Sequence, residues 1–143
     1  MKEVNIYLQT TVRGPRKVKH GIGMYVIECV VNNVPHTVHE KIKYENTYEV
    51  IMVLDLLIRA LERLTQNAKI RIFTQCEHIS SAFKCMWFIK WEKNQWKNEK
   101  GIEVKNAEKW KQIINLLKNH TYTVSKEDHP YKSWMLEEIR KEK

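Results

Sequence analysis

The chain has 143 residues, of which 43% are hydrophobic and 29% are charged, and 25 Lys and Arg stand against 17 Asp and Glu. This length and composition indicate one globular domain over residues 1–143, and the four glycines and three prolines are too few for a collagen-like or disordered chain. We expect no membrane partner, because no apolar run approaches the ~20 residues of a membrane helix and the N-terminus lacks a secretory segment. Three cysteines give no disulfide framework, so a cytoplasmic location is expected.

The first third of the sequence predicts three strands. Residues 4–8 alternate apolar and polar side chains, as a half-buried strand does. Residues 21–31 are rich in β-branched and aromatic types, and residues 36–42 follow after a turn signal at 32–35. Short connections between three strands indicate an antiparallel meander.

The pattern then changes to helices separated by single strands. Apolar residues recur at helical spacing over 48–64, and Asn46 or Thr47 can cap that helix. A strand is expected over 69–74 and one helix over 77–91.

The last third predicts an exposed loop and two further helices. Residues 93–105 are polar and charged, as an exposed loop is, and Asn106 precedes a helix with Trp110 on its buried stripe. A short strand over 121–124 and a final helix over 131–141 complete the chain, and the residues expected to face inward from that helix are Trp134, Met135 and Ile139. A meander followed by alternating strands and helices gives a mixed sheet with helices packed on its faces.

Positive charge gathers in two segments. The first is a loop around a Gly-Pro turn, and its cations are Arg13, Arg16, Lys17 and Lys19. The second runs from Lys84 to Lys118 and interleaves lysines with tryptophans. Cations beside flat aromatic rings suit a nucleic acid, although tryptophan is also a common packing residue.

The second segment carries a family resemblance. It contains Trp87-Phe88-Ile89-Lys90-Trp91-Glu92-Lys93-Asn94-Gln95-Trp96-Lys97, then Val104-Lys105-Asn106 and Trp110. These intervals resemble the helix and basic protrusion of the bacterial type I ribonuclease H enzymes, and the likeness extends over nearly the whole chain. It implies an α/β fold with a five-stranded mixed sheet, helices on both faces and the order βββαβααβα.

In that family the protrusion grips a duplex, and the enzyme cleaves the RNA strand of an RNA–DNA hybrid with two divalent metals. The resemblance therefore implies a nucleic-acid partner, either duplex or hybrid. The residues that it assigns to binding are Arg13, Arg16, Lys17, Lys19, Trp87, Lys90, Trp91, Lys93, Trp96, Lys97, Lys100 and Lys105. Because the cationic loop replaces a glycine-rich loop of the family, it favours phosphate binding in general over recognition of the 2′-hydroxyl.

The family holds its metals with four acids, and the resemblance places them at Gln9, Glu49, Gln75 and Leu136. Only Glu49 is an acid, and Glu137 lies about 100° further round its helix. Two adjacent divalent cations need several negative ligands, so we expect an inactive relative without a bound metal or other cofactor. The family's loop histidine has no counterpart in residues 124–128.

Glu49 has two interpretations. It is either a functional carboxylate or a helix N-terminal acid that accepts hydrogen bonds from Gln9 and Gln75. A zinc site at Cys76, His78 and Cys85 is not expected, because a fourth ligand and a second close pair are missing.

Two other functions remain open. One is an active nuclease that uses Mg²⁺ or Mn²⁺ with substitute acids, for which the candidates are Glu45, Glu77, Asp128 and Glu137. The other is an adaptor that docks a second protein through the tryptophan segment, because basic aromatic surfaces serve proteins as well as nucleic acids.

Overall fold

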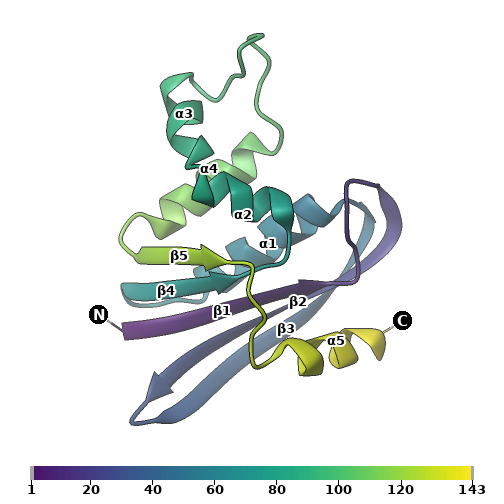
Figure 1. Ribbon diagram of the computed structural model, residues 1–143, viewed down its shortest axis with the longest axis vertical. Coiled ribbons are helices and arrows are strands. Elements are labelled where there is room, and N and C mark those ends of the chain that lie inside the picture. Colours follow the sequence, from purple (N-terminus) through teal and green to yellow (C-terminus); the bar gives the residue numbers. More distant parts are fainter. Residues whose placement is uncertain (1, 143) are drawn as a thin grey trace.

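One five-stranded mixed sheet organises the computed structural model, which describes residues 2–142 (Figure 1). Its strands are β1 (Lys2–Thr10), β2 (Val18–Val31), β3 (Val34–Thr47), β4 (Ala68–Phe73) and β5 (Thr121–Ser125). They lie in the order β3-β2-β1-β4-β5. The first three strands pair antiparallel with their neighbours. β4 pairs parallel with β1, and β5 pairs parallel with β4. The predicted meander and mixed sheet are confirmed.

Helices cover both faces of this sheet. They are α1 (Glu49–Glu62), α2 (Glu77–Lys84), α3 (Trp87–Lys93), α4 (Ala107–Leu117) and α5 (Lys132–Arg140). Figure 1 shows α1 and α4 on one side and α5 on the other. No helix among residues 2–142 is long and apolar enough to span a bilayer.

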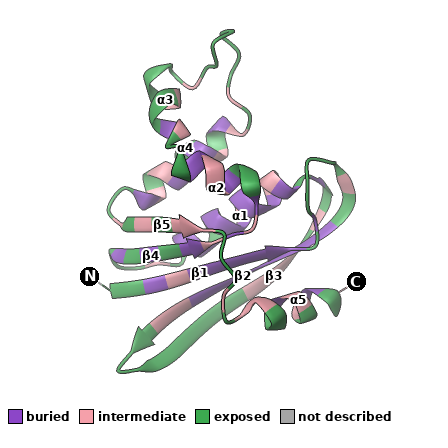
Figure 2. Cartoon of the chain, viewed as in Figure 1, coloured by how far each residue is buried: buried purple, intermediate pink, exposed green. Residues whose placement is uncertain are grey.

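The alternation of β1 divides the interior into two cores. Figure 2 colours the buried positions, which lie along the sheet strands and the helices packed on them. Ile6 and Leu8 face α1, whereas Tyr7 between them faces α5. Gly23 in β2 lets α1 approach closely, since an added Cβ would lie 2.7 Å from Cδ1 of Leu56. The period-2 pattern read from the sequence therefore decides which residue serves which core.

The carboxylate of Glu28 fixes the segment that leads into α5. It accepts hydrogen bonds from Nδ2 of Asn5 (2.9 Å), the Tyr7 hydroxyl (3.1 Å) and the Tyr131 hydroxyl (2.5 Å). Burial acts to raise the pKa of Glu28, but the three hydrogen bonds outweigh it and leave the pKa below its ordinary value. Glu28 thus joins β1, β2 and the start of α5.

The prediction of one continuous helix over 77–91 is wrong. The chain turns at Met86, which has a left-handed backbone (φ 53°), and this turn separates α2 from α3. The order is therefore βββαβαααβα. Phe83 and Phe88 explain the break, because a continuous helix would point them about 140° apart. The turn lets both rings enter the same core, with centroids 5.9 Å apart.

Two smaller expectations also fail. Trp134 is 39% exposed and meets the edge of the His39 ring, because the buried stripe of α5 consists of Met135 and Ile139. Tyr48, rather than Asn46 or Thr47, is the N-cap of α1, and it makes no side-chain capping bond. Asn106 occupies the N-cap of α4 as predicted, but its side chain makes no capping bond either.

Candidate functional site

Three of the four positions assigned to acids meet at one end of the sheet. Gln9 lies at the end of β1, Gln75 follows the neighbouring parallel strand β4, and Glu49 is the first residue of α1. Together with Thr74 and Cys76 they line a pocket with only about 10 Å³ of free volume. Gln9 and Glu49 are buried, at 3% and 8% exposure. The parallel pairing of β1 and β4 is what brings these distant residues together.

Leu136 takes another place. It packs with Phe73 and Tyr131 against the core between α5 and the sheet, and it does not line the pocket. The fourth position is therefore filled by an apolar side chain that serves packing.

Glu49 is held by the loop between β1 and β2. Its Oε1 accepts the backbone N–H of Gly14 (3.2 Å), and its Oε2 lies 4.0 Å from Nε of Arg13. Burial raises the pKa of Glu49, against the lowering effect of the Gly14 N–H, the Arg13 charge and the Cys76 thiol. The expected hydrogen bonds from Gln9 and Gln75 to Glu49 are wrong, because both amides contact other residues.

The amide of Gln9 contacts His129, whose Nε2 lies 3.1 Å from Gln9 Nε2. The His129 ring stacks on Tyr7 with centroids 4.4 Å apart, and its Nδ1 accepts the backbone N–H of Tyr131 (3.2 Å). Burial lowers the pKa of His129 to about 4, so the ring is neutral at physiological pH. His129, which immediately precedes Pro130 and the predicted final helix, was not singled out from the sequence. The signal available in the sequence was the position of His129 between the last strand and the last helix, which the fold places beside the end of β1 at Gln9.

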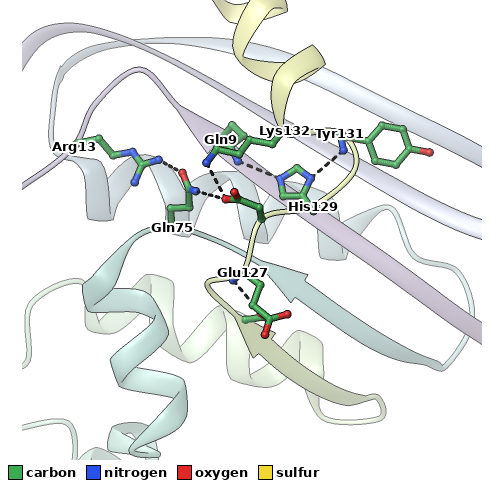
Figure 3. Close-up of polar contacts among 9 residues, drawn as sticks. Gln9, Arg13, Gln75, Glu127, His129, Tyr131 and Lys132 are labelled. Atoms are coloured by element: carbon green, nitrogen blue, oxygen red, sulfur yellow. Dashed lines mark hydrogen bonds and ion pairs between the residues drawn. The ribbon is translucent and has the colours of Figure 1, made fainter.

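The amide of Gln75 bridges two charged residues, as Figure 3 shows. Its Oε1 accepts a hydrogen bond from Nη2 of Arg13, and its Nε2 donates to Oδ1 of Asp128 (3.2 Å). Asp128 also pairs with Nζ of Lys132 (2.8 Å), which lowers the pKa of Asp128. A row of polar contacts therefore runs from Arg13 across the pocket to α5.

Of the four substitute acids, Asp128 alone is hydrogen-bonded to a pocket residue within the described chain. Glu77 pairs with Lys126, and Glu45 lies 2.8 Å from His20 on the neighbouring strand. Glu137 is exposed on α5.

The donor set does not fit a pair of divalent cations. The pocket offers one carboxylate, from Glu49, and two neutral amides. The Arg13 guanidinium also lines the pocket and lies 4.0 Å from the Glu49 carboxylate. Mg²⁺ and Mn²⁺ need anionic oxygen ligands, and the positive charge of Arg13 would repel a metal ion bound in this pocket. Within residues 2–142 no cluster of three or more His, Cys, Asp or Glu side chains could hold a metal.

Cys76 and Cys85 stand at opposite ends of α2, one buried and one exposed. Burial raises the pKa of the Cys76 thiol to about 11, and the nearby Glu49 adds to the increase. Cys76 is therefore a protonated, unreactive thiol.

Both basic segments border one hollow. It has a volume of about 460 Å³ and is lined by Gly14 and Pro15 from the β1–β2 loop, Tyr48 before α1, and Lys105 and Asn106 from the protrusion. The other cations assigned to nucleic-acid binding are exposed; they are Arg16, Lys17, Lys19, Lys90, Lys93, Lys97 and Lys100. The protrusion corresponds to the exposed loop predicted over residues 93–105. An isolated antiparallel β-bridge between Lys97 and Glu103 joins its two sides.

The tryptophans attach this protrusion to the core. Trp110 is fully buried, and its ring centroid lies 5.5 Å from that of Trp91. Trp91 in turn packs against Trp87 (6.1 Å) and Trp96 (5.8 Å), both half-buried. Packing is thus the main role of these rings, and only part of each of the three outer rings reaches solvent.

Comparison with known proteins agrees with this architecture. A ribonuclease H from Clostridium botulinum is 31% identical over 121 residues, which cover 85% of this chain and 79% of that protein. Two solved structures share the fold. LC9-RNase H1, a type 1 RNase H with the type 2 active-site motif, has a TM-score of 0.75 at 13% identity, with 98% of this chain and 71% of that one covered. LC11-RNase H1, solved in complex with RNA/DNA hybrid, has a TM-score of 0.56 at 16% identity, with 97% and 98% covered. The RNase H family model matches residues 1–126, and the chain therefore belongs to the ribonuclease H family.

Proposed function

We propose that this protein is a catalytically silent member of its family that binds duplex or RNA–DNA hybrid through the β1–β2 loop and the protrusion. The observation that carries the proposal is the hollow that Gly14 and Pro15 share with Lys105 and Asn106. A strand lying there would meet Lys105 directly and would pass beside the loop that carries Arg13 and Arg16.

The distribution of charge supports this surface. Residues 84–118 contain nine lysines and four glutamates, and residues 13–19 contain four cations and no acid. These two segments account for the whole net charge of +8, because the rest of the chain has slightly more acids than bases. Clustered cations attract a polyanion, and phosphate contacts dominate the affinity of such complexes.

The rigidity of the protrusion supports it as well. The ring contacts from Trp96 through Trp91 to Trp110 hold the base of the protrusion against the core, so its lysines project from an ordered platform. LC11-RNase H1, which shares the fold, was solved with an RNA/DNA hybrid. Contacts between lysines and phosphates depend on the nucleic-acid backbone and not on the bases, so we expect duplex DNA and hybrid to bind with similar affinity.

The pocket chemistry supports the proposal of catalytic silence. In place of four acids it has Glu49 with a raised pKa, two amides and Leu136, which packs elsewhere. Such donors leave the charge of two divalent cations uncompensated.

Fluorescence anisotropy with labelled hybrid, duplex DNA and duplex RNA tests the binding. We expect affinity to fall steeply with salt, and Lys97→Gln/Lys105→Gln to reduce the slope of log K against log salt by about 2. Lys43→Gln/Lys69→Gln is the matched control, because it removes the same charge from exposed positions outside both basic segments. Equal effects of the two double variants, or no binding at low salt, would refute the proposal.

A cleavage assay tests the silence. We expect labelled hybrid to stay intact with Mg²⁺ or Mn²⁺ at high protein concentration. Cleavage that disappears in Glu49→Gln would instead establish an active nuclease, with Asp128 as the first substitute acid to examine.

A further inference from the structure

The Arg13 side chain lies against the pocket at one end of the sheet. Its Nη2 donates to Oε1 of Gln75 (Figure 3). Its Nε lies 4.0 Å from Oε2 of Glu49. The side chains of Arg16 and Lys17 in the same loop, and of Lys19 at the start of β2, are exposed and form no hydrogen bond or ion pair within residues 2–142. Arg13 is therefore placed differently from its neighbours.

The surrounding residues suit a resident cation. Glu49 supplies one negative charge, and the amide at position 75 both accepts from Arg13 and donates to Asp128. An aspartate at position 75 could accept from Arg13 but would repel Asp128. Glutamine is thus the residue type that can join these two charged groups.

Part of Arg13 remains available to a ligand. Its side chain is 51% exposed, and only some of its five N–H donors face Glu49 and Gln75. A guanidinium presents its donors in a planar fork that matches two oxygens of a phosphate. The next residues of the loop, Gly14 and Pro15, line the hollow assigned above to nucleic acid, so the pocket and the hollow are adjacent.

We propose that Arg13 is the built-in cation of this pocket, and that it binds a backbone phosphate directly, so that the protein holds nucleic acid without a divalent metal. The inference rests on the proposed function, since it names the phosphodiester contact made at that same surface. It also assigns a purpose to the loss of three acids, because Arg13 could not share this space with a metal pair.

The first experiment measures binding of the labelled duplex in EDTA and in millimolar Mg²⁺ at matched ionic strength. We expect the wild-type affinity to change less than about twofold between them, and Arg13→Gln to weaken binding about tenfold. Arg16→Gln is the matched control, because it removes the same charge from the same loop, and we expect a smaller loss. Arg13→Lys is expected to restore part of the affinity, since it keeps the charge without the fork.

Tighter binding in Mg²⁺, or equal losses in Arg13→Gln and Arg16→Gln, would overturn the inference while leaving the proposed function intact. Absence of binding by the wild type would refute the proposed function instead.

A second experiment needs no nucleic acid. Mn²⁺ binding is measured by titration calorimetry on Gln9→Asp/Gln75→Asp, with and without Arg13→Gln. We expect removal of Arg13 to tighten Mn²⁺ binding at least about tenfold, because an adjacent positive charge is lost. An unchanged or weaker Mn²⁺ affinity in the triple variant, with folding verified by circular dichroism, would show that Arg13 does not occupy the place of the metal.

Discussion

Acidification is expected to destabilise this protein through His129. The ring stacks on Tyr7 and contacts Gln9, and burial lowers its pKa from 6.5 to about 4. A group whose pKa is lower in the folded state favours folding fully above its unfolded pKa, and this contribution is lost as the pH falls from about 6.5 to about 4. Since one pKa unit corresponds to about 1.4 kcal/mol, proton uptake by the unfolded chain lowers the free energy of unfolding by about 2 kcal/mol between pH 8 and pH 5.

Urea denaturation followed by tryptophan fluorescence measures this difference in wild type and in His129→Phe. The phenylalanine keeps a ring beside Tyr7 but cannot be protonated, so the loss between pH 8 and pH 5 is expected to shrink by about 2 kcal/mol. Glu28 does not interfere, because its lowered pKa places its own effect in more acidic solution. Any constant cost of the substitution cancels when each protein is compared with itself at the two pH values.

His36→Phe is the control, because His36 is exposed on β3 and its loss leaves the pocket unchanged. It is expected to keep the wild-type pH dependence. If His129→Phe also kept it, or if NMR titration of His129 gave a midpoint near its ordinary value, the ring would be solvated and the reasoning from burial would fail.

Three further predictions concern packing and the acid side of the pH profile. Gly23→Ala is expected to lower the free energy of unfolding by about 1–3 kcal/mol, because the new Cβ would meet buried Leu56, and less in a Leu56→Ala background; chemical denaturation measures both. Trp110→Ala is expected to cost about 3–5 kcal/mol, and Trp110→Phe less, because both remove a buried indole N–H that has no partner in the described structure but phenylalanine fills more of the space; thermal melts would contradict this if the two variants were equal. Glu28→Gln is expected to cost about 1–3 kcal/mol at neutral pH, because three donors lose a charged acceptor, and less as the pH falls below about 4.5, because the unfolded wild-type chain then takes up a proton at Glu28 that the folded protein binds only at lower pH; a cost independent of pH would refute the lowered pKa of Glu28.

The elements of the sheet were predictable because each depends on a local pattern. Alternation over residues 4–8 indicated a strand, and it also decided that Ile6 and Tyr7 face different cores. The split between α2 and α3 was not predictable in this way. It depends on the packing of Phe83 and Phe88 in the same core, which arises only when both helices pack against that core.

The candidate site was also predictable only in part. The family resemblance pointed to Gln9, Glu49 and Gln75, and the fold brings them to one pocket, where β1 and β4 run parallel. Spacing also placed the fourth position at Leu136, but a residue of the helix stripe can serve the core as well as the pocket, and here it serves the core.

The sequence by itself determined the five strands, most of the helices, the two basic segments and the neutral side chains at three positions where the family resemblance implies acids. Only the tertiary structure decided that Arg13 reaches Gln75, 62 residues away, and that His129 reaches Gln9, 120 residues away. Periodicity reports which face of an element is buried, whereas both of these contacts are made by loop residues outside any repeating pattern. Their partners are set by how β1, β4 and the start of α5 end beside one another in the folded sheet.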